Sequence, residues 1–279
     1  MSGSSLQREK YVEGFSFERH TYKFRNDFKP SLVKWGYIPC GDAQYGLCGG
    51  MALASQIYYL KDAKNNFDHK CRAPDDKVAP TRESNPSLLE YLKECQVATI
   101  TASALFNYVG YMWTGSSTDT TKLLAEWPKI QQSIDKNEPS VVGLIIGKGS
   151  LNPRTWLNFL RSHQVLVYGY QCAGTVVSLL FYDPSREPSD NPGEIRFDSQ
   201  TGKIIEQTAG LERICSFFKL QCNFFKTPPS VSRRLESKQH QEPIPSLALK
   251  PLAASPASNI RDVEQDFFPA VRESHNYSP

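Results

Sequence analysis

The sequence lacks several features that define whole classes of protein. It has no apolar run as long as the roughly 18 residues of a membrane-spanning helix, and no basic-then-apolar leader at its start. A net charge of +3, without lysine and arginine runs interleaved with aromatic residues, argues against nucleic acid as a partner. We therefore expect a cytoplasmic protein, or one exported without a cleaved signal peptide, that binds neither nucleic acid nor membranes.

The cysteines form no pattern typical of a disulfide framework or a metal site. All seven are scattered along the 279 residues, which favours reduced thiols. His69 and Cys71 make an H-x-C pair, but no second pair at zinc-site spacing completes a tetrahedral set of ligands. The sequence therefore predicts no metal and no cofactor.

The pattern of apolar residues changes along the chain from helical to extended. One-sided apolar spacing predicts a helix over 48–64, and further helices are expected over 86–95, 101–112 and 119–136, the last open to a break at Pro128. β-branched and aromatic runs predict strands over 140–147, 163–171, 176–183, 193–198 and 215–225. This order indicates an α+β domain with helices packed on an antiparallel sheet, rather than alternating parallel units.

Three segments differ in composition. Residues 1–27 mix polar and aromatic residues and predict a strand or an extended N-terminal arm, and residues 28–227 hold the predicted domain. Residues 228–279 contain eight prolines, eight serines and no glycine, which predicts a disordered tail. An apolar stretch over 260–268 could dock this tail on a partner or on the domain, although a solvated tail is the simpler interpretation.

Residues 45–60, YGLCGGMALASQIYYL, place a cysteine at the start of the first predicted helix. The unpaired N–H groups and the positive dipole end of a helix N-terminus favour thiolate over thiol at Cys48. Gly46, Gly49 and Gly50 would let the chain turn and leave room for a substrate carbonyl beside the sulfur. Without a base nearby, a small buried cysteine at a glycine-rich turn explains the same residues.

A base and an orienting carboxylate are available downstream. His163 begins one predicted strand and Asp183 ends the next, so a hairpin around QCAGT, residues 171–175, would bring both side chains to one edge of the sheet. By contrast, His20 and His69 fall in polar stretches where we expect exposed side chains. The chain thus contains a nucleophile, a base and an orienting group in the roles of a catalytic triad.

The motifs YGLCGGM, HQVLVYGY and YDPS resemble, in their order, the papain-like cysteine peptidase superfamily, and more closely its bacteriocin-processing-peptidase-like branch, over about residues 28–225. The resemblance implies a papain-like α+β fold and a cysteine peptidase that cleaves a protein or peptide substrate through a thioester. It implies Cys48 as nucleophile, His163 as general base and Asp183 as the orienting group. Gln44 would be a side-chain donor to the oxyanion hole. A deamidase or acyltransferase, and a catalytically silent binding module, stay open as alternatives on the same fold.

Overall fold

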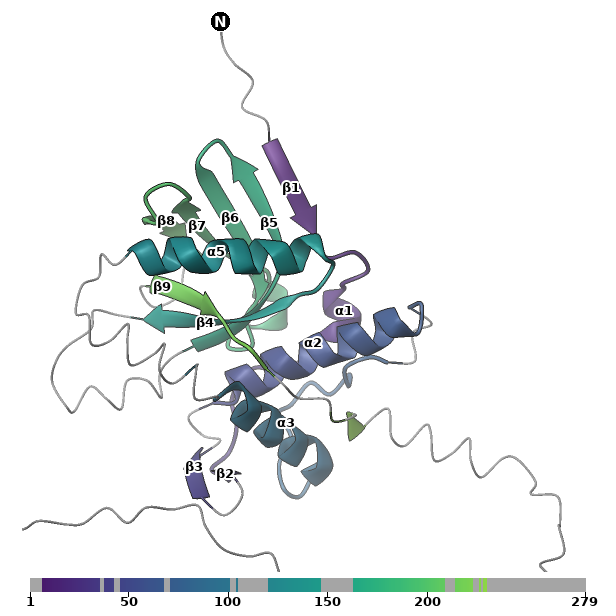
Figure 1. Cartoon of the computed structure of the whole chain (residues 1–279). Coiled ribbons are helices and arrows are strands. Elements are labelled where there is room, and N and C mark those ends of the chain that lie inside the picture. The colour runs from purple at the N-terminus through teal and green to yellow at the C-terminus, as the bar shows by residue number, and fades with distance from the viewer. Residues whose placement is uncertain are drawn as a thin grey trace, which may run out of the picture. The chain divides into compact units, whose positions relative to one another are not determined.

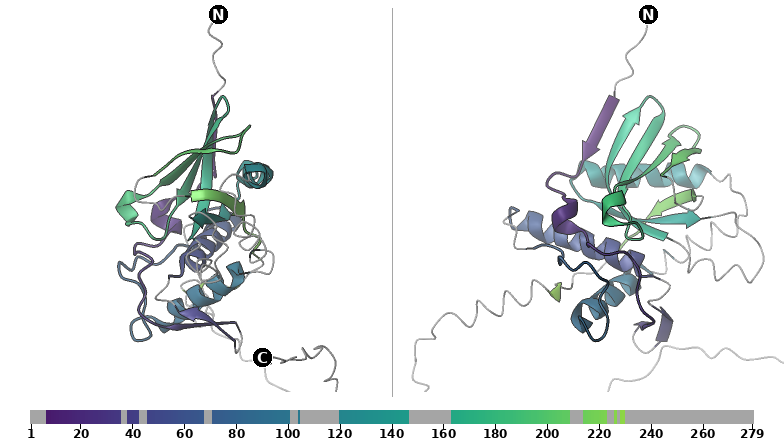
Figure 2. Two further views of the ribbon diagram at one scale, coloured as in Figure 1. Left: turned by 90° about the vertical axis from the view of Figure 1, so that its left-hand side faces the viewer. Right: turned by 180° about the vertical axis from the view of Figure 1, so that it is seen from behind.

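The fold is an antiparallel sheet with helices on both faces (Figures 1 and 2). The computed structural model describes residues 7–35, 38–42, 46–67, 71–100, 104, 120–146, 163–208, 214–222, 226, 228 and 229. Its helices are α1 (Phe17–His20), α2 (Cys48–Lys64), α3 (Pro86–Thr99), α5 (Thr120–Asp135) and the short 3-10 helix η3 (Pro188–Asp190). Its strands are β1 (Gln7–Tyr11), β2 (Leu32–Trp35), β3 (Ile38–Asp42), β4 (Ser140–Ile146), β5 (His163–Ala173), β6 (Val176–Tyr182), β7 (Gly193–Asp198), β8 (Ile204–Gln207) and β9 (Ile214–Lys219).

β5 is the strand around which the main sheet is organised. The strand order is β8-β7-β6-β5-β4-β9, and β1 also pairs with β5. β4 pairs with residues 163–167 of β5 and β1 pairs with residues 169–173, so the two follow one another along the same side of β5. All pairings are antiparallel, and β2 and β3 form a separate hairpin. The predicted α+β arrangement with an antiparallel sheet is confirmed.

The sheet separates two apolar cores because successive strand residues point to opposite faces. In β4, Val141 and Ile145 belong to the core shared with α2 and α3, whereas Val142 and Leu144 belong to the core under α5. α5 covers its face with residues at helical spacing, namely Leu123, Trp127, Ile130 and Ile134. Figure 1 shows α5 lying across the strands and α2 and α3 on the other side of β4.

Helix α2 has the predicted bounds but not the predicted one-sided burial. Every residue over 48–55 is buried, and Leu60, part of the expected apolar stripe, is 42% exposed. The helix is enclosed because it packs on the sheet, on α3 and on the N-terminal segment at once. A helix buried on nearly all sides has no single apolar face for a sequence pattern to reveal.

Other elements differ from expectation in extent. α3 continues four residues beyond the predicted end, and α5 runs through Pro128 without a break. The predicted helix over 101–112 lies outside the described residues except at position 104, and the predicted strand over 215–225 ends at Lys219. Within the part of the chain that the structure describes, no helix is both long enough and apolar enough to cross a membrane.

The N-terminal segment is built into the domain. β1 pairs with β5, and the Val12 N–H continues this pairing by donating to the Tyr168 carbonyl at 2.8 Å. Tyr22 and Phe24, farther along, are buried in the core around α2. Residues 7–24 therefore connect the sheet to the helical side of the molecule.

Candidate active site

A sharp turn places Cys48 at the first position of α2. Gly46 has a φ of +99°, which favours glycine, and a Cβ there would collide with the side chain of Asn26. The buried Leu47 follows, and Cys48 is 9% exposed. The backbone N–H groups of Cys48 and Gly49 have no acceptor within the described ranges, as expected for the first turn of a helix.

The β5–β6 hairpin brings His163 and Asp183 together. Ala173 pairs with Val176 across the hairpin, so His163 at the start of β5 and Asp183 directly after β6 lie at the same end. The Nε2 atom of His163 is 2.6 Å from Oδ1 of Asp183. The two side chains that the sequence placed at one sheet edge are therefore in direct contact.

One effect lowers the pKa of His163 and two effects raise it. Burial disfavours the imidazolium, but the Asp183 carboxylate and a hydrogen bond with Cys48 outweigh this effect and raise the pKa of His163 to about 10. Because Nε2 faces Asp183, Nδ1 is the ring nitrogen left for the sulfur of Cys48. At neutral pH the site therefore holds an imidazolium between the Asp183 carboxylate and the Cys48 sulfur.

Asp183 is fixed in place by the loop that follows β6. Its side chain is fully buried, and Oδ1 also accepts a hydrogen bond from the Ser185 N–H at 2.8 Å. The Asp183 N–H donates to Oδ1 of Asn191 at 2.8 Å, and the Asn191 side-chain amide returns a bond to the Asp183 carbonyl. The carboxylate thus cannot turn away from His163 without losing the hydrogen bond from the Ser185 N–H.

The two glycines after Cys48 serve packing rather than substrate access, which corrects the expectation from the sequence. Neither has a positive φ. A Cβ on Gly49 would collide with Oε1 of the buried Gln164, and a Cβ on Gly50 would collide with the backbone carbonyl of Leu92 in α3. The Gly50 N–H donates to Oε1 of Gln96 at 2.9 Å. The glycine pair lets α3 and β5 approach the first turn of α2.

Of the four predicted site residues, the structure brings three together. Gln44 lies outside the described residues, so its role in an oxyanion hole stays a prediction. The sequence analysis missed Asn26, whose Oδ1 accepts a hydrogen bond from the Leu47 N–H directly before the cysteine. No local motif marks Asn26, since it lies 21 residues upstream of its partner.

The expectation of an exposed His20 is wrong. Its side chain is fully buried, with Nε2 3.1 Å from Oδ2 of the buried Asp62. The Ser16 N–H donates to Nδ1 of His20 at 3.0 Å, so Nδ1 is an acceptor and Nε2 carries the proton toward Asp62. This second histidine–aspartate pair joins α1 to α2, whereas His69 lies outside the described residues.

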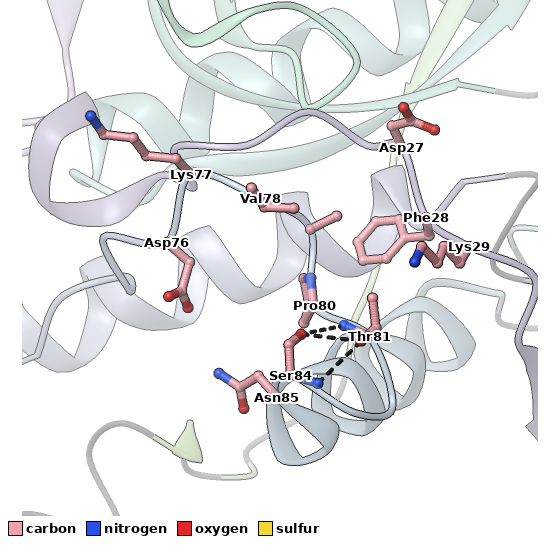
Figure 3. Close-up of a pocket in the computed structure, with 11 residues that line it drawn as sticks. Asp27, Phe28, Lys29, Asp76, Lys77, Val78, Pro80, Thr81, Ser84 and Asn85 are labelled. Carbon is pink, nitrogen blue, oxygen red and sulfur yellow. Dashed lines mark hydrogen bonds between the residues drawn. The ribbon is translucent and has the colours of Figure 1, made fainter.

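A concavity of about 610 Å³ lies between the N-terminal segment and the loop before α3 (Figure 3). It is lined by residues 27–29, 76–81, 84 and 85, which include no cysteine and no histidine. Figure 3 shows the charged groups of Asp27 and Lys77 pointing away from each other, while Thr81 and Ser84 are joined by hydrogen bonds within their own turn. The concavity therefore contains neither the thiol nor the imidazole of the candidate triad.

Comparison with known proteins identifies no relative. No protein-family model matches the chain, and neither a curated protein nor a solved structure matches it. The interpretation of the site therefore depends on its geometry and chemistry.

Proposed function

We propose that the protein is a cysteine hydrolase with a papain-like fold that cleaves amide bonds in a protein or peptide substrate. The observation that carries this proposal is the meeting of Cys48, His163 and Asp183, which come from α2, from β5 and from the loop after β6. A nucleophile, a base and an orienting carboxylate in this order of contact are what acyl transfer through a thioester requires.

The proposed reaction starts from an ion pair between a Cys48 thiolate and the His163 imidazolium. The Cys48 thiolate attacks the carbonyl carbon of the substrate, and the oxyanion that forms accepts a hydrogen bond from the Cys48 N–H, with Gln44 proposed as second donor. The His163 imidazolium gives its proton to the amine as the C–N bond breaks, which leaves a thioester. Neutral His163 then takes a proton from water, whose oxygen attacks the thioester; the acid product leaves and the thiolate is restored.

The electrostatics favour an enzyme over a silent binding module. Burial opposes a charged His163, and a buried ion pair is often replaceable by apolar side chains without loss of stability. A cation held against a carboxylate and a thiol is instead useful for proton transfer, and such perturbed groups cluster at functional sites.

Alkylation tests the activated nucleophile. At about pH 6, where ordinary thiols with a pKa near 8.5 are protonated, brief treatment with iodoacetamide should label Cys48 first. Two other cysteines are internal controls, because burial raises the pKa of Cys172 and raises that of Cys222 to about 12. Peptide mass spectrometry reads the positions. Equal labelling of all cysteines, or none on Cys48, would overturn the proposal.

Matched variants show whether the base is responsible. His163→Gln should abolish labelling of Cys48 at about pH 6, whereas His20→Gln should leave it unchanged. Both substitutions remove a histidine paired with a buried aspartate, but the His20 partner is Asp62 rather than a residue of the site. If both substitutions reduced the labelling of Cys48 equally, the loss would be due to destabilisation of the fold.

Acylation tests the chemistry itself. p-Nitrophenyl acetate should give a burst of one p-nitrophenolate per protein, with the acetyl group on Cys48 by mass spectrometry, followed by slow hydrolysis. Cys48→Ser should show no burst. Adding an amine then separates hydrolysis from acyl transfer, because an acyltransferase would form the acetylated amine in place of acetate.

A further inference from the structure

Asn26 bonds to both halves of the candidate active site. Its Oδ1 accepts a hydrogen bond from the Leu47 N–H, at the turn that leads into Cys48. Its own N–H donates to the Pro184 carbonyl at 2.8 Å, and its Nδ2 lies 3.4 Å from Oγ of Ser185. Pro184 and Ser185 directly follow Asp183. Asn26 therefore contacts both the turn that leads into Cys48 and the loop that carries Asp183.

The two halves otherwise belong to different parts of the fold. Cys48 begins α2, whose N-cap residue Leu47 makes no side-chain capping bond of its own. His163 and Asp183 are carried by the β5–β6 hairpin of the sheet. The distance between sulfur and imidazole therefore depends on the packing of Gly49 against Gln164 and on how the start of α2 is held against the loop after β6.

The turn before Cys48 is shaped around this contact. Gly46 adopts a positive φ, and the absence of a Cβ lets the Asn26 amide approach the backbone there. The neighbouring Arg25 holds the same loop from outside, through Ser185 O at 3.3 Å and Glu187 Oε1 at 3.2 Å. Arg25 and Glu187 are both more than half exposed, and Arg25 makes no hydrogen bond to the turn before Cys48 among the described contacts.

We propose that Asn26 is a positioning residue that aligns the Cys48 sulfur with the His163 imidazole, an inference that rests on the proposed function. It touches no reacting atom and acts through the Leu47 N–H. Without the Asn26 side chain, the first turn of α2 keeps its packing on α3 and on β5 but loses its hydrogen bond toward the Asp183 loop. Misalignment of about 1 Å lowers reaction rates by up to about 100-fold.

The test compares Asn26→Ala with Asn85→Ala. Asn85 is a matched control, because its Oδ1 accepts the Leu88 N–H at 3.2 Å at the start of α3, so both substitutions remove one asparagine acceptor near a helix start. The readout is the rate of Cys48 alkylation by iodoacetamide between about pH 5 and pH 9, with the thermal midpoint of each protein measured alongside.

Asn26→Ala should lower the alkylation rate at about pH 6 by roughly 10-fold to 100-fold and move the rate profile to higher pH. Asn85→Ala should leave the alkylation profile unchanged although it lowers the thermal midpoint by a similar amount to Asn26→Ala. Arg25→Ala should also leave the alkylation profile unchanged. Gly46→Ala perturbs the same contact from the other side and should move the profile in the same direction, which decides the matter if Asn26→Ala does not fold.

Wild-type profiles for both Asn26→Ala and Gly46→Ala would overturn the positioning role, as would an equal shift in Asn85→Ala. These outcomes are distinct from failure of the proposed function, in which wild-type Cys48 itself would show no selective alkylation at about pH 6.

Discussion

The Asp183→Asn substitution is the sharpest probe of the site, because it removes a charge and almost no volume. Asp183 is the main reason that the pKa of His163 is raised from 6.5 to about 10 in spite of burial. That difference corresponds to roughly 5 kcal/mol at ~1.4 kcal/mol per pH unit. At pH 7, imidazolium should exceed imidazole by roughly 1000 to 1 in the wild type.

In the variant, burial acts without the carboxylate to oppose it. The pKa of His163 should fall toward 6.5 or below, so that much of the imidazole is neutral at pH 7. The asparagine Oδ1 can still accept hydrogen bonds from His163 and from the Ser185 N–H, which preserves the loop. Selective alkylation of Cys48 should weaken at about pH 7, where the imidazolium no longer predominates.

NMR titration of the histidine rings, with His163 assigned from its absence in His163→Gln, measures this pKa directly. Control of this pKa by Asp183 is excluded if the wild-type His163 titrates near 6.5, or if it titrates at the same pH in Asp183→Asn. A lowered pKa with unchanged alkylation would show that His163 does not control the thiol.

Three further predictions follow from packing, burial and composition. Gly50→Ala should lower the free energy of unfolding by about 1–3 kcal/mol in urea titrations, because its Cβ meets the backbone carbonyl of Leu92, which cannot rotate away; no change would contradict the close approach of α2 and α3. Burial lowers the pKa of His20 below 6.5, so the unfolded chain binds this proton more readily and stability should fall as the pH drops below about 6.5; His20→Gln should flatten this part of the stability profile, and an unaltered slope would argue against it. Removing residues 230–279, rich in proline and serine, should leave the thermal midpoint unchanged, whereas a drop of several degrees would make the tail part of the fold.

Local patterns were sufficient to predict the elements that carry the site. The helix starting at Cys48, the strand starting at His163 and the hairpin that ends beside Asp183 all depend on residues close together in the chain. Alternation of apolar residues and a short turn fix such a hairpin without reference to the rest of the molecule.

The features that the sequence could not reveal depend on distant segments. Asn26 gains its role only where the N-terminal segment meets both α2 and the Asp183 loop, and His20 is buried only because α1 packs on α2. The sequence suggests that Gly49 and Gly50 form a turn, and their packing against Gln164 and α3 is visible only in the folded structure. The pairing of β1 with β5 joins segments that are far apart in the chain, with Gln7 opposite Ala173 and Tyr11 opposite Gly169, and no local pattern specifies it.

The order of the elements along the chain has a consequence for the newly made protein. The ribosome releases Cys48 and Asn26 long before β5 and β6, so the thiol emerges without its imidazole and without the carboxylate behind it. Contacts between residues far apart in the chain form late in folding, because the long segment between them must first close into a loop. If Cys48 and His163 act as proposed, the sulfur therefore meets its base only when the sheet has formed, and a partly synthesised chain cannot yet carry out the reaction.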